Sequence, residues 1–523
     1  MKVLIPCAGI GSRLGYFTKN FNKALIQVGL KPVISHIIDC YPLDTEFTLA
    51  LGYKGGHIQE FLKMAYPKKK FNFVKIKNYD GPNSGLTHTL EKCSDFIKDK
   101  FVFHANDSLI VNNRFSKNLK DDTLILSSNL SDSMRYRTAS INGKHIKKIF
   151  DKKNHQLKNV YNYTGVSFIK DYKTFVEAIR KDKKNIGEVS YFLNQIENKK
   201  KVSFKITNTW YDIGDANYYK KVSEKFEKIN IIPKNDQGIF FIQNNVFKFF
   251  TDSKIVKKRV KRSSNLKKLV PKITSAKNYF YSYKFVKGQI LSYSKNIDQD
   301  LKNLLNWSKE NLWRKKNLDH LSNKKFFNSC HEFYYEKTLS RVDLFYSNNN
   351  IIDEELKINN TLIPSLEKII NLIDWKNLSN GIPVKYHGDF HFENIIKINK
   401  KKFCLIDFRE SFGNLDNIGD QYYDLAKLKH GFEVNHQIIN DKLFNIKRDG
   451  NEVKFDIFIK ENYLNCKKIL DEFILDNNLS SKKVEIIKNL IFLNISALYT
   501  YPYSNFLFYM GKYKLYKSII DVK

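Results

Sequence analysis

The sequence is poor in several features that mark whole classes of protein. Its six cysteines are scattered, with no CxxC pair and no Cys/His metal spacing, which favours a reducing cytoplasm over a disulfide scaffold. No uncharged stretch reaches the roughly 18 apolar residues of a membrane helix. Residues 1–9 run from an apolar strand pattern into glycines and do not resemble a signal peptide. We therefore predict a cytoplasmic protein without membrane insertion.

Acidic residues are also scarce, because 54 Asp and Glu stand against 89 Lys and Arg, a formal net charge of +35 at pH 7. Nucleic-acid-binding domains carry such a charge on one clustered face. Here the lysines are spread along the chain, and the densest basic run covers only residues 257–268. We predict no nucleic-acid partner and expect the positive field to favour small anionic substrates such as nucleotides. An oligomer remains possible.

A chain of 523 residues is too long for one ordinary core. Up to about residue 224, short apolar runs alternate with helical patterns, which predicts a mostly parallel sheet with helices on both faces. A polar link follows at residues 228–237. Beyond it come a hairpin at 238–251, a strand pair, and then long amphipathic stretches. We predict two domains, residues 1–228 and 238–523: an α/β domain, then a small sheet with a helical lobe (α+β).

The first strand pattern is followed directly by the motif AGIGSRL at residues 8–14. Glycines without a Cβ allow the backbone to approach a polyphosphate closely, with N–H groups pointing at the anion. Arginine offers a planar fork for phosphate oxygens and lysine a mobile point charge. The candidate phosphate-binding and catalytic residues of this loop are Ala8, Gly9, Gly11, Ser12, Arg13 and Lys23.

The pattern GxGSRL, continued as KALxxVxxKPV at 23–33, resembles the opening of the sugar nucleotidyltransferase superfamily, which includes enzymes for sugar 1-phosphates and for phosphocholine. The resemblance extends through residues 51–58, 81–90, 103–110, 161–169, 187–196 and 210–219. It implies a Rossmann-like nucleotidyltransferase domain. It also implies a reaction in which a phosphate monoester attacks the α-phosphorus of an NTP and pyrophosphate leaves.

The resemblance assigns further residues of this domain. It implies that Asp107 and Asp212 bind Mg²⁺, a hard ion that takes oxygen ligands together with substrate phosphates. The remaining implied contacts are with the nucleotide base (Gly81, Ser84, Gly85) and with the sugar (Gly165, Glu188).

A second motif, HGDFHFEN at residues 387–394, is followed by LIDF at 405–408. An H-x-D-x-x-x-x-N motif with a strand ending in Asp-Phe is a phosphoryl-transfer arrangement. The segment resembles the aminoglycoside phosphotransferase and choline kinase family, and so implies a bilobal, protein-kinase-like domain. The resemblance implies Asp389 as the catalytic base, Asn394 and Asp407 as Mg²⁺ ligands, and Lys248 as the contact to the ATP phosphates. No glutamate between residues 251 and 273 offers the usual partner of Lys248.

Together the two motifs predict a bifunctional enzyme. One domain would phosphorylate a small hydroxyl compound with ATP, and the other would couple the ester to a second NTP (CTP, UTP or GTP), with Mg²⁺ in both sites. In the families that the chain resembles, such products feed capsule or lipopolysaccharide synthesis. We favour a sugar or polyol. Choline kinase with CTP:phosphocholine cytidylyltransferase is one alternative, and an active nucleotidyltransferase with a degenerate, regulatory kinase-like domain is another.

Overall fold

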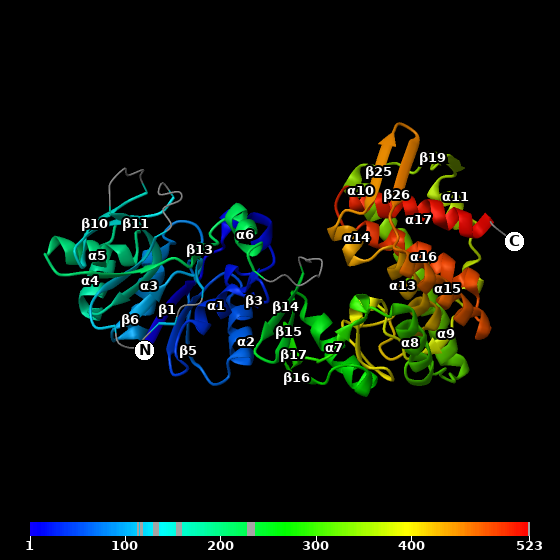
Figure 1. Ribbon diagram of the computed structural model, residues 1–523, viewed down its shortest axis with the longest axis horizontal. Helices are drawn as coiled ribbons and strands as arrows, with labels where there is room; N and C mark the ends of the chain where they lie inside the picture. The colour runs from blue at the N-terminus through cyan, green and yellow to red at the C-terminus, as the bar shows by residue number, and fades with distance from the viewer. Residues whose placement is uncertain (112–113, 116–118, 129–134, 153–158, 227–235, 521–523) are drawn as a thin grey trace. The chain divides into compact units, whose positions relative to one another are not determined.

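The computed structural model describes residues 1–111, 114–115, 119–128, 135–152, 159–226 and 236–520 (Figure 1). The chain forms two compact units. The first contains Met1–Ser253 and Ser275–Ser282, and the second contains Lys254–Thr274 and Tyr283–Lys523. Within the described residues, no helix combines the length and the apolar character that crossing a bilayer requires.

A nine-stranded sheet is the centre of the first unit, in the order β5-β4-β1-β6-β11-β8-β12-β10-β9. Its strands are β1 (Lys2–Cys7), β4 (Glu46–Leu51), β5 (Lys70–Lys75), β6 (Phe101–His104), β8 (Thr123–Ser127), β9 (Thr138–Asn142), β10 (His145–Phe150), β11 (Val160–Ile169) and β12 (Ser203–Thr207). Two strand pairs lie outside this sheet: β2 (Gln27–Val28) with β3 (Lys31–Pro32), and β7 (Ser108–Ile110) with β13 (Trp210–Asp212).

Helices cover both faces of the sheet, as the βα alternation predicted (Figure 1). Successive side chains of a strand point to opposite faces, so Val3 and Ile5 of β1 enter one core while Leu4 enters the other. The first core includes α1 (Val33–Asp39) and α2 (Gly55–Ala65). The second includes α3 (Leu86–Ile97), α4 (Tyr172–Lys181) and α5 (Glu188–Glu197), while α6 (Ala216–Ser223) follows β13.

The sheet is less parallel than we expected. Strands β5, β4, β1 and β6 are parallel, but β11 runs antiparallel to β6, β8 and β9, and β10 runs antiparallel to β9 and β12. The expectation of a mostly parallel sheet is therefore wrong for the part of the sheet that runs from β11 to β9. Strands β9 and β10 are joined by a tight turn at Gly143–Lys144, where Gly143 has φ +56°. A two-residue hairpin requires antiparallel pairing, and a glycine at its first position favours such a turn.

The predicted link between the domains falls largely on residues 227–235, outside the described residues. The first unit continues beyond it into the expected hairpin, β14 (Gln237–Ile242) with β15 (Asn245–Phe250). These strands belong to a sheet with the order β14-β15-β17-β16, where β16 is Ile273–Ala276 and β17 is Phe280–Lys284. The domain boundary at 228–238 stays a prediction.

The hairpin shares its core with helix α2. The ring of Phe61 on α2 lies 5.5 Å from that of Phe240, 5.8 Å from Phe247 and 5.7 Å from Phe280, measured between centroids. All four side chains are buried in the same cluster as β1 and β4. Each buried phenylalanine removes about 150–250 Å² from water, so the hairpin stabilises the first unit directly.

The second unit is mainly helical. It begins with α7 (Ser253–Leu266) and η3 (Lys267–Leu269) and continues after β17 with β18 (Gln289–Ile290) and η4 (Leu291–Tyr293). Its later helices are α8 (Ile297–Asn311), α9 (His320–His331), the π-helical turn η5 (Glu332–Glu336), α10 (Lys337–Asn349), α11 (Leu366–Asn371), α12 (Trp375–Ser379), η6 (Phe392–Asn394), α13 (Gln421–Glu433), α14 (His436–Asn440), α15 (Glu461–Asp476), α16 (Ser481–Ser496) and α17 (Tyr503–Ile520).

Three small sheets complete the second unit. The first pairs β18 with β22 (Ile395–Asn399) and β23 (Lys402–Leu405), and another pairs β21 (Pro383–Val384) with β24 (Gly419–Asp420). The third has the order β20-β19-β26-β25, from β19 (Leu356–Ile358), β20 (Thr361–Ile363), β25 (Phe444–Asp449) and β26 (Glu452–Ile457). Helix α13 packs against α15 and α16 and is buried from Tyr422 to Glu433. It is the rigid element behind the HGDFHFEN segment.

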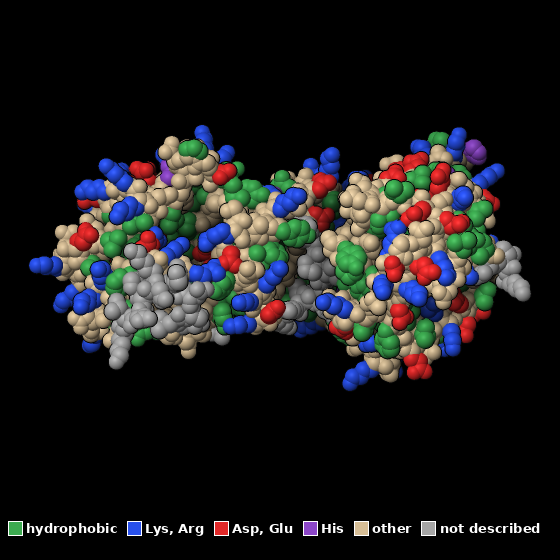
Figure 2. All heavy atoms as spheres, turned by 90° about the horizontal axis from the view of Figure 1, so that it is seen from above, with side chains coloured by type: hydrophobic (Ala, Val, Ile, Leu, Met, Phe, Trp, Pro, Cys, Tyr) green, Lys and Arg blue, Asp and Glu red, His purple; other side chains and the backbone are tan. Residues whose placement is uncertain are grey.

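Basic side chains do not form one continuous patch on the face drawn in Figure 2. Figure 2 shows Lys and Arg scattered over the visible surface, with Asp and Glu between them.

The shared core predicts a long-range effect of Phe247→Ala. Truncating a buried phenylalanine costs about 3–5 kcal/mol, and here the loss should loosen α2, far away in the sequence. We expect faster amide hydrogen exchange in peptides from residues 55–65, measured by mass spectrometry on the full chain. Phe96→Ala is the matched control, because Phe96 is 49% exposed on α3. Unchanged exchange in α2 of a folded Phe247→Ala variant would contradict the shared core.

Candidate active sites

The glycine-rich loop follows β1 and leads into a 3₁₀ turn, η1 (Ser12–Thr18). Gly11 has φ +74°, and a Cβ there would come 3.1 Å from Cγ2 of Thr18, so the turn requires glycine. The carbonyl of Ala8 accepts a hydrogen bond from Tyr53 N at 2.9 Å. Gly9, Ser12 and Arg13 are exposed, which leaves this side of the loop open to a ligand.

Asn22 holds the loop in place, and the sequence analysis missed it. Its Nδ2 donates to the carbonyls of Cys7 (3.1 Å) and Tyr53 (2.6 Å), and its Oδ1 accepts from Ala24 N at 2.8 Å. Asn22 is fully buried. The hydrogen bond to Ala24 caps the short η2 turn (Lys23–Leu25), and so sets the direction of Lys23. Asn22 precedes Lys23 in the motif, which was the available signal.

Asp107 and Asp212 come together although they are more than a hundred residues apart. Strands β7 and β13 pair so that Asp212 lies opposite Ser108, and Ile213 N donates to the carbonyl of Asp107 at 3.0 Å. A Cβ on Gly214 would lie 2.9 Å from Oδ1 of Asp212 and 3.5 Å from Oδ2 of Asp107. Only a glycine lets both carboxylates approach the same point.

The electrostatics of the pair are asymmetric. Nζ of Lys23 lies 2.7 Å from Oδ2 of Asp107. Burial raises the pKa of Asp107, but the charges of Lys23 and Arg13 outweigh it and hold that pKa below its usual range. Burial, followed by the charge of Asp107, raises the pKa of Asp212. Tyr136, which the sequence analysis missed, donates to Oδ2 of Asp212 at 3.0 Å.

The arrangement fits Mg²⁺ better than a transition metal. Among the described residues, no group of three or more His, Cys, Asp or Glu side chains is placed to hold a metal ion. Mg²⁺ is usually bound by one or two carboxylates together with substrate phosphates and water. Two adjacent carboxylates beside a phosphate-type loop supply that donor set.

A second loop leads from β5 to the start of α3. Gly81, Ser84 and Gly85 belong to it, and Oγ of Ser84 donates to the carbonyl of Gly81 at 2.7 Å. Asn185, missed from the sequence, ties this loop to the start of α5: its Oδ1 accepts from Thr87 N at 2.9 Å and its Nδ2 donates to Ser84 O at 3.4 Å. The predicted base loop and the Glu188 helix therefore share one anchor.

Gly165 and Glu188 lie on neighbouring elements. The carbonyl of Gly165 on β11 accepts from Ala105 N at 2.9 Å, just before Asp107. Glu188 is the first residue of α5 and is buried, and its Oε1 accepts from Tyr163 OH at 3.1 Å. Its Oε2 is buried with no hydrogen-bond partner in the described part of the chain. Burial raises the pKa of Glu188 from 4.5 to about 7. An unpaired buried carboxyl oxygen is suited to a hydroxyl of a bound ligand.

In the second unit, the HGDFHFEN segment forms a compact hydrogen-bonded loop. Nδ2 of Asn394 donates to the backbone oxygen of Asp389 (3.0 Å) and to its Oδ2 (3.1 Å). His387 is fully buried, and burial lowers its pKa to about 4. It therefore acts as a neutral connector: Nδ1 accepts from Asp389 N at 3.2 Å and Nε2 donates to Ile406 O at 2.8 Å. Asp407 follows Ile406 with φ +57°.

Asp424 anchors the loop from α13. Its carboxylate accepts from the backbone N–H groups of His387 and Gly388, both at 2.7 Å, and from Nε1 of Trp313 at 3.1 Å. Burial raises the pKa of Asp424 to about 6. This geometry is that of a structural partner of the loop. Arg262 of α7 supports the same segment by donating to the carbonyls of Tyr386 and Arg409.

Lys427 is the residue of this unit that the sequence analysis missed. Its Nζ lies 2.9 Å from Oδ1 of Asp389. His391, by contrast, contacts members of the loop itself: Nδ1 lies 2.7 Å from Oε2 of Glu393 and Nε2 lies 3.0 Å from Nδ2 of Asn394. Lys427 stands one helical turn after Asp424 on α13, so its spacing in GDQYYDLAK was the available signal.

Lys248 is buried on β15 and belongs to the first unit, whereas Asp389, Asn394 and Asp407 belong to the second. The role of Lys248 toward ATP stays a prediction.

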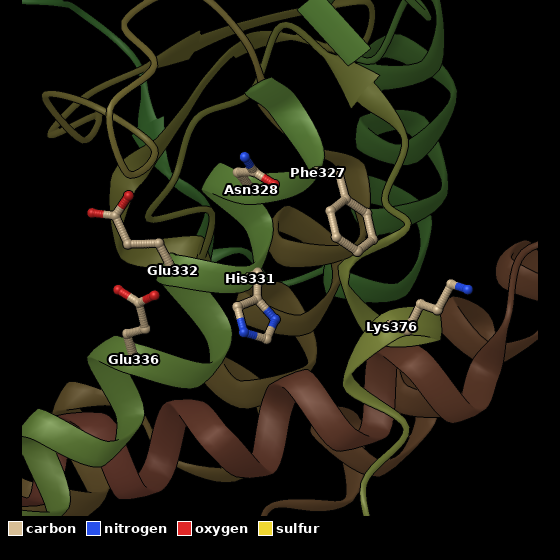
Figure 3. A pocket seen from close by; sticks show the side chains of 6 residues that line it. All are labelled: Phe327, Asn328, His331, Glu332, Glu336 and Lys376. Carbon is tan, nitrogen blue, oxygen red and sulfur yellow. The ribbon is translucent and has the colours of Figure 1, made fainter. Parts of the chain in front are cut away.

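A hollow of about 440 Å³ lies on the second unit (Figure 3). It is lined by Phe327, Asn328, His331, Glu332, Glu336 and Lys376. None of the predicted site residues lines it.

Comparison with known proteins finds relatives that match the first half of the chain. No protein-family model matches the chain. It is 41% identical over 63 residues to the "Probable glucose-1-phosphate cytidylyltransferase" of Bacillus subtilis, which is 12% of this chain and 25% of that protein. It is 23% identical over 217 residues to the "Bifunctional protein GlmU" of Methanocaldococcus jannaschii, 41% of this chain and 51% of that protein.

The first half of the chain resembles nucleotidyltransferases. The matches cover no more than about half the length of either relative. Among solved structures, the CTP:phosphocholine cytidylyltransferase of Streptococcus pneumoniae aligns with a TM-score of 0.34 and 21% identity, over 43% of this chain and 98% of that one.

The raised pKa of Glu188 predicts a pH-dependent effect of Glu188→Gln. The unfolded carboxyl ionises near pH 4.5 and the folded one near 7, so the native state loses stability as the pH rises between these values. Glutamine has no such penalty. Relative to wild type, the variant should gain up to about 3 kcal/mol between pH 4.5 and pH 8, read from urea unfolding of the full chain. Glu177→Gln, exposed on α4, is the control. A pH-independent difference would show that Glu188 is not held neutral by burial.

Proposed function

We propose that the first unit is a nucleotidyltransferase that joins a phosphate monoester to an NTP and releases pyrophosphate. The observation that carries this proposal is the approach of Asp107 and Asp212 to one point beside Lys23 and the glycine-rich loop. The similarity of this half to nucleotidyltransferases supports it. Gly165 and Glu188, on the elements next to Asp107, are suited to hold the group that carries the phosphate.

Each of these residues has a separate role in the proposed reaction. The backbone of the glycine-rich loop and Arg13 bind the β- and γ-phosphates, and Lys23 neutralises charge that grows on the leaving pyrophosphate. Asp107 and Asp212 would hold Mg²⁺, which supplies positive charge at the α-phosphate. An oxygen of the monoester forms a bond to the α-phosphorus as the bond from that phosphorus to the bridging oxygen breaks. No proton transfer is required of the protein.

We further propose that the second unit is a small-molecule kinase that makes the monoester. Its support is the contact of Asn394 with Asp389, next to Ile406 and Asp407. Asp389 takes the proton of the acceptor hydroxyl, while the acceptor oxygen forms a bond to the γ-phosphorus and ADP leaves. Asn394 and Asp407 would hold Mg²⁺ on the ATP phosphates through their oxygens.

The two reactions form a sequence if the kinase product is the nucleotidyltransferase substrate. R–OH and ATP give R–O–phosphate, and the ester with a second NTP gives NDP–R. Tethering the two sites raises the local concentration of the intermediate. We propose that NDP–R is a precursor of a surface polysaccharide, because an activated group of this kind is the donor that such synthesis consumes.

The carboxylate pair predicts that Asp212→Asn abolishes nucleotidyl transfer. Losing one metal-binding carboxylate should remove several kcal/mol of transition-state stabilisation, which corresponds to a drop on the order of a hundredfold or more. The assay is pyrophosphate release from an NTP with a phosphorylated sugar or polyol. Asp39→Asn is the matched control, because Asp39 is exposed and forms an ion pair with Lys31 on the surface. ATP-dependent phosphorylation should persist, and a folded variant that loses both activities would refute separate sites.

The catalytic loop predicts the complementary result for Asp389→Asn. The side chain keeps its volume but cannot accept the proton, so phosphorylation should fall by about a hundredfold to ten-thousandfold. ATP binding should survive, because Asn394 and Asp407 remain. The variant should still make NDP–R from chemically phosphorylated R. Asp449 is exposed, so Asp449→Asn is the control and should also make NDP–R from that substrate. Full kinase activity in Asp389→Asn would overturn the assignment.

A further inference from the structure

Four cationic side chains of the second unit form a group that begins at Asp389, which Lys427 contacts. Lys337 and Arg341 come from α10, one turn apart, and Arg409 comes from the segment after Asp407. Lys427 comes from α13. None of the four carries a role in phosphoryl transfer proposed above.

Contacts connect Lys337, Arg409 and Lys427 in a chain, and the charge of Arg341 acts on Lys337. Nζ of Lys337 lies 3.9 Å, and Cζ of Arg409 lies 5.0 Å, from the ring centroid of Phe333. Nη1 of Arg409 donates to Tyr423 OH at 3.2 Å. Tyr423 is one turn before Lys427 on α13, and Lys427 contacts Asp389. The cations therefore extend from the catalytic aspartate outward along one path.

The positive charge is compensated only in part: Asp389 pairs with Lys427, and the charges of Glu410 and Asp389 act on Arg409 from a longer distance. Of the described carboxylates, only Asp389 lies within 4.0 Å of Lys427 Nζ, and none lies that close to a charged nitrogen of Lys337, Arg341 or Arg409. Glu410, next to Arg409, lies 3.5 Å from Arg259. Burial, followed by the charges of Arg409, Arg341 and Lys427, holds the pKa of Lys337 well below its usual range. Partly buried like charges repel unless an anion joins them.

We infer that the alcohol phosphorylated by the second unit is an anion, a small hydroxyl compound that carries a carboxylate or phosphate group. Lys337, Arg341 and Arg409 bind that group, arginine by paired hydrogen bonds, and the hydroxyl reaches Asp389. The inference rests on the proposed kinase function. It disfavours choline, because a quaternary ammonium would add positive charge here, and cations already lie over the ring of Phe333.

The reaction balances with an anionic acceptor. The hydroxyl oxygen forms a bond to the γ-phosphorus of ATP, the bond between that phosphorus and the β,γ-bridging oxygen breaks, and the proton passes to Asp389. The acceptor's own anionic group takes no part and serves only for binding.

The charge of the acceptor can be tested without knowing its identity. A low-molecular-weight extract of the source cells is passed over an anion-exchange column, and the flow-through and each eluted fraction are incubated with the full chain, Mg²⁺ and γ-³²P-labelled ATP. Labelled products that also form with Asp389→Asn are subtracted. We expect the labelled ester to arise from a retained fraction.

Each result decides something different. A labelled product formed only from the flow-through, which contains neutral and cationic compounds, would overturn the inference and leave the kinase function standing. No product from any fraction would count against the kinase function itself. Within a retained fraction, treatment with phosphatase before the assay separates the two sources of charge, because it destroys a phosphorylated acceptor and spares a carboxylic acid.

Variants of the outer cations test the binding role. Lys337→Met and Arg341→Gln should each raise the KM for the acceptor by about tenfold to a hundredfold, as expected for the loss of a charge-assisted hydrogen bond. The KM for ATP should stay within about twofold of wild type. Lys302→Met, exposed on α8, is the control and should change neither constant. Unchanged acceptor KM in both folded variants would contradict the inference.

Discussion

Two carboxylates that approach the same glycine are the constraint on which the first unit depends. Asp107 and Asp212 repel each other, as the raised pKa of Asp212 shows, and Lys23 offsets only part of that repulsion. The pair persists because the backbone fixes it: β7 is hydrogen-bonded to β13, and Asn22 directs Lys23. A site under this repulsion gains most when a cation and phosphates arrive, which is what a metal-dependent transfer to phosphorus requires.

In the second unit the excess charge has the opposite sign. Asp424 anchors the backbone of the HGDFHFEN loop through the N–H groups of His387 and Gly388, which fixes the position of Asp389. Around Asp389 the excess charge is positive, from Lys427 outward to Lys337. In both units some buried charge is only partly compensated by the protein, and the charged ligands proposed above would complete that compensation.

Local patterns in the sequence singled out residues that lie close together in the structure, while their roles stay predictions. Asp107 and Asp212 follow strand patterns, and strands that meet at one edge of a sheet bring such residues together. The H-x-D-x-x-x-x-N spacing likewise anticipated the contact between Asn394 and Asp389. Helices on both faces of the first sheet followed from the βα alternation. The mostly parallel sheet was wrong, because β11 and β10 run antiparallel to their neighbours, and among the described strands of this sheet only the β9–β10 reversal has a two-residue turn, at Gly143–Lys144.

Residues that contact partners far away in the sequence could not be predicted from such local patterns. Asn185 donates a hydrogen bond to Ser84, about a hundred residues earlier in the sequence. Phe61 contacts Phe240, which lies on the other side of the predicted link. Neither follows from hydrophobic period or from motif spacing, because both depend on how elements pack. Lys427 is intermediate: its helical spacing from Asp424 was visible, but its contact with Asp389 depends on where α13 lies.

The most direct test of the coupled reaction follows one phosphate through both sites. The full chain is incubated with Mg²⁺, the unphosphorylated acceptor fraction, an NTP, and ATP carrying ¹⁸O on its γ-phosphate, and the products are analysed by mass spectrometry. The account predicts NDP–R that carries the label on the phosphate next to R and on the oxygen that bridges the two phosphates, while the non-bridging oxygens next to the nucleoside stay unlabelled. An NDP–R product without label, or labelled R–O–phosphate that the chain never couples to any of the four NTPs, would contradict it.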